Sequence, residues 1–299
     1  MEKIKLWIKA MRFFSLPLVI SAVFLGAACA KVEGYFSLSI FLLLFITGSL
    51  LQILSNLAND YGDATNGADG ENRSSPKGTV SRGKITKKEM LYAISITAGL
   101  SFVFALLLIY VSFGTALWAW IVFGILTILT IIAAIRYTMG KNPYGYRAKG
   151  DLSVFIFFGI VAVAGSYCFF NAPLYKIPGL PACAAGLFTT AVLNANNIRD
   201  MKSDRIYGKD TIALRLGEEF SRYYQLTLIG GGIICWAIYF MLLYPTSYLL
   251  LLVFTAPLVY SAYKVYTCYD VITLDKQVKL TAKATGLYQF IISLVFFFQ

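Results

Sequence analysis

The chain has 299 residues, of which 58% are hydrophobic and 16% aromatic, and its mean hydropathy is +0.69. A soluble domain is typically about 45–50% apolar, so the excess indicates that lipid is the solvent for much of the chain. The sequence contains no histidine, which excludes imidazole bases and histidine metal ligands.

Apolar runs long enough to cross a bilayer, about 20 residues each, recur along the chain. Backbone groups in hydrocarbon need partners within their own segment, so these runs predict helices. The first run lacks a cleavage site followed by a polar segment, and we expect a membrane helix there, not a cleaved signal peptide. The predicted spans lie near residues 14–31, 37–57, 90–112, 116–135, 152–171, 179–197, 223–243, 247–265 and 284–298. We therefore expect an all-α integral membrane protein of about nine transmembrane helices, forming one domain over residues 1–299.

The distribution of positive charge predicts the orientation. If the N-terminus is cytoplasmic and the spans alternate, all but two of the 26 Lys and Arg lie inside, the exceptions being Lys31 and Lys176. This bias follows the positive-inside rule and argues that the net charge of +11 serves topology and the lipid bilayer, not nucleic acid. Nine spans then put the C-terminus outside. The five cysteines form no CxxC pair, so we expect neither a disulfide framework nor a zinc site.

Two polar stretches end apolar runs on the predicted cytoplasmic side: "NLANDYGDATNGAD" at 56–69 and "NANNIRDMKSDRIYGKDTIALRLG" at 194–217. In each stretch an Asn precedes an Asp by four residues, and a further carboxylate follows. Spacings of three and four residues bring side chains to one face of a helix. Carboxylates held so close repel unless a cation lies between them, and oxygen-only ligands suit Mg²⁺. The candidate metal ligands are Asn59, Asp60, Asp63, Asp69, Asn196, Asp200 and Asp204.

Two other interpretations of these stretches are open. Each stretch alone is also typical of a solvated helix end, although two similar stretches on one membrane face favour a shared site. Carboxylates at a membrane face also mark ion paths, so a cation-coupled transporter is an alternative. The many neighbouring cations favour an anionic phosphate substrate instead.

Both stretches resemble the two Asp-rich motifs of the UbiA superfamily of membrane prenyltransferases. More narrowly, "YTMGKNPYGYRAKGDLSVFIFFGIVAVAGSY" at 137–167 resembles the segment of the branch that acts on 1,4-dihydroxy-2-naphthoate in menaquinone synthesis. The resemblance implies a helical bundle around a central cavity with both motifs at its cytoplasmic mouth. It also implies Mg²⁺-dependent transfer of a polyprenyl group from polyprenyl diphosphate to the naphthoate, giving demethylmenaquinone. A relative with another aromatic acceptor is the alternative within the family.

Cations and tyrosines near the motifs are the candidate substrate-binding groups. Arg73, Arg82 and Lys209 lie close to the carboxylates in sequence, and we expect some of them to bind diphosphate oxygens. Tyr137 and Lys141 match a Tyr-x-x-x-Lys pattern that the wider superfamily uses near its substrates. With Asp60, Asp63, Asp200 and Asp204, these two residues form the predicted catalytic set. The substrate-binding candidates, for diphosphate or naphthoate, are Asn59, Arg73, Arg82, Lys141, Arg147, Asn196 and Lys209.

Overall fold

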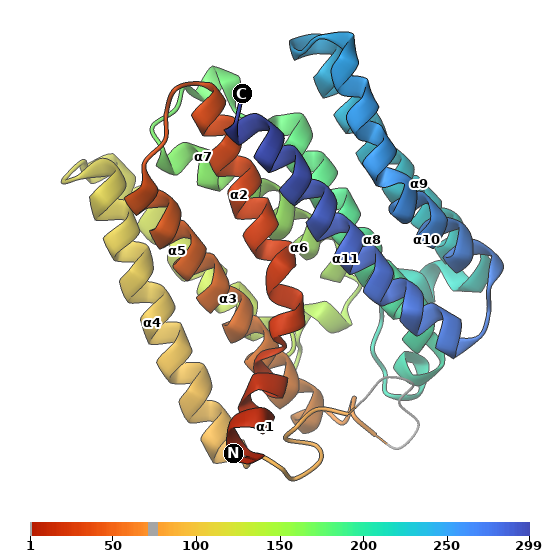
Figure 1. Cartoon of the computed structure of the whole chain (residues 1–299). Coiled ribbons are helices and arrows are strands. Elements are labelled where there is room, and N and C mark those ends of the chain that lie inside the picture. The colour runs from red at the N-terminus through yellow and green to blue at the C-terminus, as the bar shows by residue number, and fades with distance from the viewer. Residues whose placement is uncertain (1, 71–76) are drawn as a thin grey trace.

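The computed structural model describes residues 2–70 and 77–299, and the regular structure in them is helical. Its longer helices pack side by side in one bundle (Figure 1). These helices are α1 (Glu2–Met11), α2 (Leu16–Val32), α3 (Leu38–Thr65), α4 (Lys87–Phe113), α5 (Leu117–Arg136), α8 (Gly179–Ile206), α9 (Ile212–Leu243), α10 (Ala256–Thr267) and α11 (Val271–Phe297). The shorter ones are α6 (Gly150–Val154), the π-helical stretch η3 (Phe155–Gly165) and α7 (Ser166–Phe169), which run on from one another, and the 3₁₀ segments η1 (Phe13–Ser15), η2 (Tyr144–Tyr146), η4 (Leu174–Lys176) and η5 (Thr246–Thr255).

Eight helical segments in the described part of the chain are long and apolar enough to cross a membrane. The predicted span at 179–197 is the one that falls outside this set. It forms the first part of α8, which is long enough, but the helix continues through Asn194, Arg199 and Asp200 and is therefore more polar than the other spans. The expectation of an all-α protein with about nine membrane helices is thus confirmed to within one span.

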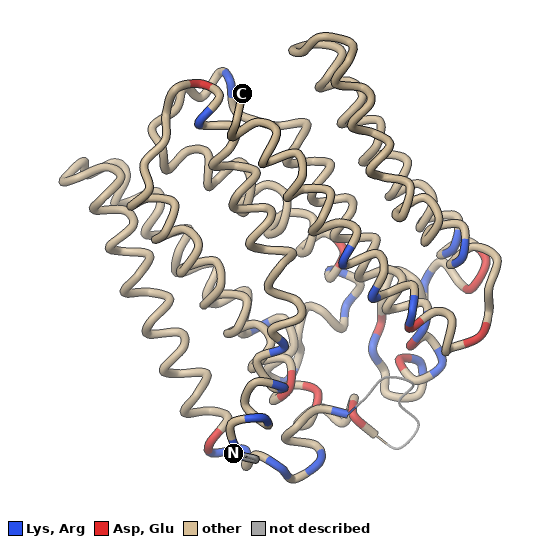
Figure 2. Tube along the Cα trace, in the orientation of Figure 1, with Lys and Arg blue, Asp and Glu red and all other residues tan. Residues whose placement is uncertain are grey.

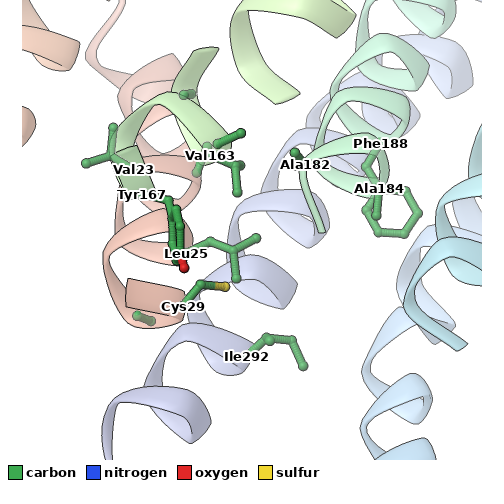
Figure 3. Close-up of a cluster of buried hydrophobic side chains, with 14 of the residues drawn as sticks. Val23, Leu25, Cys29, Val163, Tyr167, Ala182, Ala184, Phe188 and Ile292 are labelled. Atoms are coloured by element: carbon green, nitrogen blue, oxygen red, sulfur yellow. The ribbon is translucent and has the colours of Figure 1, made fainter. Parts of the chain in front are cut away.

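Small residues let the central helices approach closely. A Cβ added to Gly26 of α2 would lie 2.3 Å from the carbonyl oxygen of Val163, and one added to Gly159 would lie 2.5 Å from that of Ala182. Because lipid tails are as apolar as the helix surfaces, close van der Waals packing of this kind drives helix association in membranes. Figure 3 shows the resulting core, where side chains of α2, η3, α8 and α11 meet.

The two ends of the bundle differ in charge. In Figure 2 nearly all charged residues gather at the end where the N-terminus lies, and the C-terminus lies at the opposite end. Few charges lie at that opposite end. Lys176 forms an ion pair with Glu33, which follows the last residue of α2. A membrane protein with its polar chemistry on one face has this distribution.

The length of two helices places the polar motifs beyond the apolar layer. α3 and α8 have 28 residues each, so each is roughly 42 Å long. The hydrocarbon layer is roughly 30 Å thick. The last turns of both helices therefore project past it at the charged end, and these turns carry the two Asp-rich motifs.

Candidate active site

The first motif lies at the end of α3 and packs tightly against the segment that follows α5. The hydroxyl of Thr138 donates to the carbonyl oxygen of Ala58 at 3.0 Å, and the amide of Asn66 donates to the carbonyl oxygen of Thr138 at 2.7 Å. A Cβ added to Gly62 would lie 2.5 Å from that same Thr138 oxygen, so only glycine fits there. These contacts fix the turn of α3 that carries Asp63.

Asp63 faces a tyrosine from the loop between α5 and α6. The hydroxyl of Tyr146 donates to Asp63 Oδ1 at 2.6 Å, and the Asp63 side chain is buried. A hydroxyl donor to a carboxylate makes a short, strong hydrogen bond. The loop that holds Tyr146 is thereby tied to the first motif.

The second motif lies at the end of α8, where Asp200 is held by its neighbour Arg199. The guanidinium donates to Asp200 Oδ1 at 2.9 Å and to Oδ2 at 2.7 Å. The same group donates to Asn196 at 2.6 Å and to Asp275 of α11 at 2.8 Å. These four residues are defined here as the Arg199 network. Arg199 and Asp200 are buried at its centre, whereas Asn196 and Asp275 are half-buried at its edge.

The two motifs meet through Tyr146 and Lys209. The Lys209 ammonium lies 3.8 Å from Asp204 Oδ1 and 5.7 Å from the centroid of the Tyr146 ring. Since Tyr146 also donates to Asp63, one continuous set of contacts runs from α3 to α8. Residues 141 positions apart in the sequence, Asp63 and Asp204, therefore border a single site.

Backbone pairing between loops strengthens this junction. Ala148 donates its N–H to the carbonyl oxygen of Asp210 at 2.7 Å, and Asp210 donates its own N–H to the carbonyl oxygen of Tyr146 at 3.2 Å. On the other side, a Cβ added to Gly70 would lie 2.1 Å from the hydroxyl of Tyr207, so the end of the first motif touches the residue that follows α8.

Asp60 and Asp69 are engaged differently from Asp63. Asp60 accepts hydrogen bonds from the N–H and hydroxyl of Thr79 and from the N–H of Val80, and Asp69 accepts from the N–H of Gly78 and the hydroxyl of Ser81. Both carboxylates are buried. Asp63 therefore faces the second motif, whereas Asp60 and Asp69 contact the loop that follows the first motif.

The predicted cations lie at different depths. Lys209 is half-buried inside the junction, whereas Lys141, Arg147 and Arg82 are exposed on the charged end of the molecule. The prediction for Arg73 lies outside the described residues. Lys209 is therefore the predicted cation that contacts a motif carboxylate in the described part of the chain.

Tyr137 lies at the end of α5, next to the start of α6. Its ring packs edge-on against Tyr144 with centroids 5.4 Å apart, and a Cβ added to Gly150 would lie 2.9 Å from its hydroxyl. Burial, with the nearby Asp151 carboxylate, raises the pKa of Tyr137 well above its usual value. The hydroxyl consequently keeps its proton and can act as a hydrogen-bond donor.

The donor groups at this site fit Mg²⁺. Carboxylate and amide oxygens are its preferred protein ligands. Asn197 adds a buried side-chain oxygen that accepts no hydrogen bond from the described residues, and it lies two turns before Asp204 on the same face of α8. No three carboxylates or thiolates converge within the described ranges. Mg²⁺ usually takes one or two carboxylates and completes its shell with water and substrate phosphates, so such a cage is not required.

Several residues of the site were not among the predicted ones. Asn197 sits beside the predicted Asn196, and only the packing of α8 distinguishes the two: Asn196 accepts from Arg199, while the Asn197 oxygen does not. Thr79 and Asp275 carried no signal in the sequence, because each reaches its Asp only through the fold. Arg199 is adjacent to Asp200 in the sequence, but its contact with α11 is a tertiary feature.

Comparison with known proteins identifies relatives over most of the chain. The family model described as the UbiA prenyltransferase family matches residues 19–281. Over 233 residues the chain is 46% identical to the 1,4-dihydroxy-2-naphthoate octaprenyltransferase of Escherichia coli (strain K12), covering 78% of this chain and 75% of that protein.

Solved structures share the fold. The apo structure of a UbiA homolog from Aeropyrum pernix K1 superposes with a TM-score of 0.71 at 16% identity, covering 96% of this chain and 97% of that one. The structure of a UbiA homolog from Archaeoglobus fulgidus bound to DMAPP and Mg²⁺ superposes with a TM-score of 0.59 at 14% identity, covering 97% and 99%. The predicted UbiA-like helical membrane fold is confirmed.

Proposed function

Because the chain belongs to the UbiA prenyltransferase family, we propose that it transfers a polyprenyl group from a polyprenyl diphosphate to 1,4-dihydroxy-2-naphthoate. The acceptor is taken from the relative that is 46% identical. The observation that carries the proposal is the set of contacts from Asp63 through Tyr146 and Lys209 to Asp204, which joins both motifs into one carboxylate-rich site with a cation inside it.

The reaction balances without an external oxidant or reductant. The allylic C–O bond breaks and its electron pair leaves with diphosphate. The ring carbon that bears the carboxylate then bonds to the prenyl carbon, and that carboxylate leaves as CO₂ while its bonding pair returns to the ring. The products are demethylmenaquinone in its reduced form, diphosphate and CO₂.

The motif residues would hold Mg²⁺ against the diphosphate. Asp63, Asp200 and Asp204, with the amides of Asn196 and Asn197, present oxygen donors on two facing helix ends, and Asn59 is half-buried one turn before Asp63. When bound there, Mg²⁺ would supply positive charge against the charge that develops on the leaving diphosphate. Arg199 holds Asp200 and Asn196 in place, which pre-orients these donors.

Cations and tyrosines would complete substrate binding. Lys209 is placed to contact diphosphate oxygens as a point charge, and Arg82 is a second, exposed candidate. Tyr137, which keeps its proton, would donate to the departing oxygen. Lys141 or Arg147 would receive the acceptor's carboxylate before that group leaves.

The protein is a multi-pass membrane protein. We propose that it lies in the inner or plasma membrane of the cell with its charged end on the cytoplasmic side. The charge distribution in Figure 2 supports this orientation by the positive-inside rule. A cysteine introduced at the exposed Thr65 should be labelled from the cytoplasmic side and one at the exposed Thr246 from outside. Labelling from the reverse sides would overturn the orientation.

A transfer assay tests the proposed function directly. Membranes containing the protein are incubated with Mg²⁺, a labelled polyprenyl diphosphate and either 1,4-dihydroxy-2-naphthoate or 4-hydroxybenzoate. We expect prenylated product and CO₂ release with the naphthoate only. Preferential transfer to 4-hydroxybenzoate would overturn the acceptor, and transfer to neither would overturn the activity.

A further inference from the structure

The loop after the first motif is held by carboxylates of that motif. We define the anchored loop as residues 77–85, which lie after the first motif in the sequence and shortly before α4. Thr79 donates its N–H to Asp60 Oδ2 at 2.8 Å and its hydroxyl to the same oxygen at 2.6 Å, while Val80 donates its N–H to Asp60 Oδ1 at 3.1 Å. A carboxylate has about four acceptor positions, and three of those of Asp60 are occupied.

Asp69 holds the same loop from the other side. Its Oδ2 accepts from the Gly78 N–H at 2.8 Å and from the Ser81 hydroxyl at 2.5 Å. The approach is so close that a Cβ on Gly78 would lie 2.3 Å from Asp60 Oδ1 and 2.9 Å from Asp69 Oδ2. Glycine at this position is therefore needed for both carboxylates to reach the backbone.

The anchored loop is itself folded and packed. The carbonyl oxygen of Thr79 accepts from the N–H groups of Lys84 and Ile85 at 3.0 and 3.4 Å. The side chains of Val80 and Ile85 are buried in a cluster with Leu54 and other residues of α3 and α4. The two buried N–H groups that donate to Asp60 would lose their partner if that carboxylate turned away to bind an ion.

The end of the first motif, which the anchored loop contacts through Asp69, also touches the segment that follows α8. Asp69 is followed by Gly70, which touches the hydroxyl of Tyr207 from the loop after α8. Asp60 is one helical turn before Asp63, so the backbone that carries Asp63 is fixed by the loop on one side and by Thr138 at Gly62 on the other.

We infer that Asp60 is a positioning residue that acts through the anchored loop, to which Asp69 adds a second contact through its Oδ2, and that Asp63 is a metal-binding carboxylate of the first motif. The inference deepens the proposed function and rests on it for the metal. From the sequence, Asp60 is expected to bind metal together with Asp63 and Asp69, whereas its hydrogen bonds assign Asp60 to the loop.

Four variants separate the two tasks. Asp60→Asn removes acceptor capacity from the loop anchor, and Thr79→Val removes one donor while keeping the shape and leaving every carboxylate intact. Thr79→Ser restores the hydroxyl and serves as the matched control. Asp63→Asn weakens the metal site without touching the described loop contacts. For the purified protein, amide hydrogen exchange of residues 78–81 is measured together with the Mg²⁺ activation constant, kcat and KM for the prenyl diphosphate.

We expect Asp60→Asn and Thr79→Val to speed exchange of these amides at least about tenfold and to lower kcat/KM about ten- to a hundredfold, since small misplacements at a site have effects of this order. Both should leave the Mg²⁺ activation constant within about twofold of wild type, and the double variant should be no worse than Asp60→Asn alone. Thr79→Ser should restore wild-type values. Asp63→Asn should raise the Mg²⁺ constant more than about tenfold with unchanged exchange.

The inference is overturned if Asp60→Asn raises the Mg²⁺ constant as much as Asp63→Asn does, or if Thr79→Val leaves exchange at wild-type rates. If Asp60→Asn does not fold, Gly78→Ala replaces it as the variant that separates the loop from the carboxylates. Amide exchange is measured without turnover. If wild type failed to catalyse the proposed transfer, the exchange rates would still show whether Asp60 holds the loop, so the two failures are distinguishable.

Discussion

Asp60 and Asp200 look alike in the sequence, each within an Asn- and Asp-rich end of an apolar helix, but the structure surrounds them differently. Asp60 is held by three donors without charge, the N–H and hydroxyl of Thr79 and the N–H of Val80. Asp200 is held by the guanidinium of Arg199, which also reaches Asp275. Similar positions at two helix ends thus carry different contacts: Asp60 holds a loop, whereas Asp200 belongs to the Arg199 network, which links α8 to α11.

The next aspartate in each motif, Asp63 in the first and Asp204 in the second, also has a different partner. Asp63 accepts from the Tyr146 hydroxyl, and Asp204 lies beside the Lys209 ammonium. Lys209 also packs over the Tyr146 ring, so the two carboxylates border the same site although their partners differ. Four predictions test which of these contacts matter most, in order of expected effect.

The largest effect is expected from the carboxylates proposed to hold Mg²⁺. Asp63→Ala or Asp200→Ala should lower turnover about a thousandfold, which corresponds to about 4 kcal/mol of lost transition-state stabilisation. Turnover is measured on membranes with equal amounts of inserted protein, and EDTA should silence wild type until Mg²⁺ is restored. Turnover near the wild-type rate in either variant would remove that residue from the site.

The Arg199 network should matter mainly for stability. Arg199→Met leaves Asp200 and Asp275 without their shared cation, and breaking a buried pair in this way typically costs about 3 kcal/mol or more of the free energy of unfolding. Arg199→Lys should recover only part of it, because an ammonium cannot bind both Asp200 oxygens in bidentate fashion. Unfolding of the purified protein in detergent measures this. Equal stability of Arg199→Met and wild type would mean that the network does not fix α8.

The hydrogen bond between Tyr146 and Asp63 should have an intermediate effect. Tyr146→Phe keeps the ring over Lys209 but removes a hydrogen bond to a charged group, worth about 1.5–3 kcal/mol. We expect kcat/KM to fall about ten- to a hundredfold, with the Mg²⁺ activation constant raised in parallel. Tyr146→Leu, which also removes the ring, is the matched comparison. A fall confined to Tyr146→Leu would assign the effect to ring packing.

The smallest effect is expected from the exposed loop cations. Lys141→Met or Arg147→Met should raise KM for the naphthoate about tenfold, since a single exposed charge-assisted contact lies at the low end of its range. The KM for prenyl diphosphate should change little. If both variants weaken only the prenyl diphosphate, these cations serve the diphosphate and the acceptor's carboxylate is bound elsewhere.

Much of this protein was predictable from local pattern. Continuous apolar runs specify membrane helices because hydrocarbon offers the backbone no partner, and the runs matched helices in the described part of the chain. The run at 179–197 is the exception. It forms the first part of α8, but the polar residues of the same helix make α8 less apolar than the other membrane helices.

Hydropathy and short-range spacing are properties of neighbouring residues, so the helical membrane fold, the charged face and the two carboxylate-rich helix ends follow from the sequence. Which carboxylate meets which partner depends on how the helices pack. Thr79 reaches Asp60 because Val80 and Ile85 bury themselves between α3 and α4, and Asp275 reaches Arg199 because α11 packs against α8. Such pairings depend on the packing of helices distant in the chain, and no spacing within one helix encodes them.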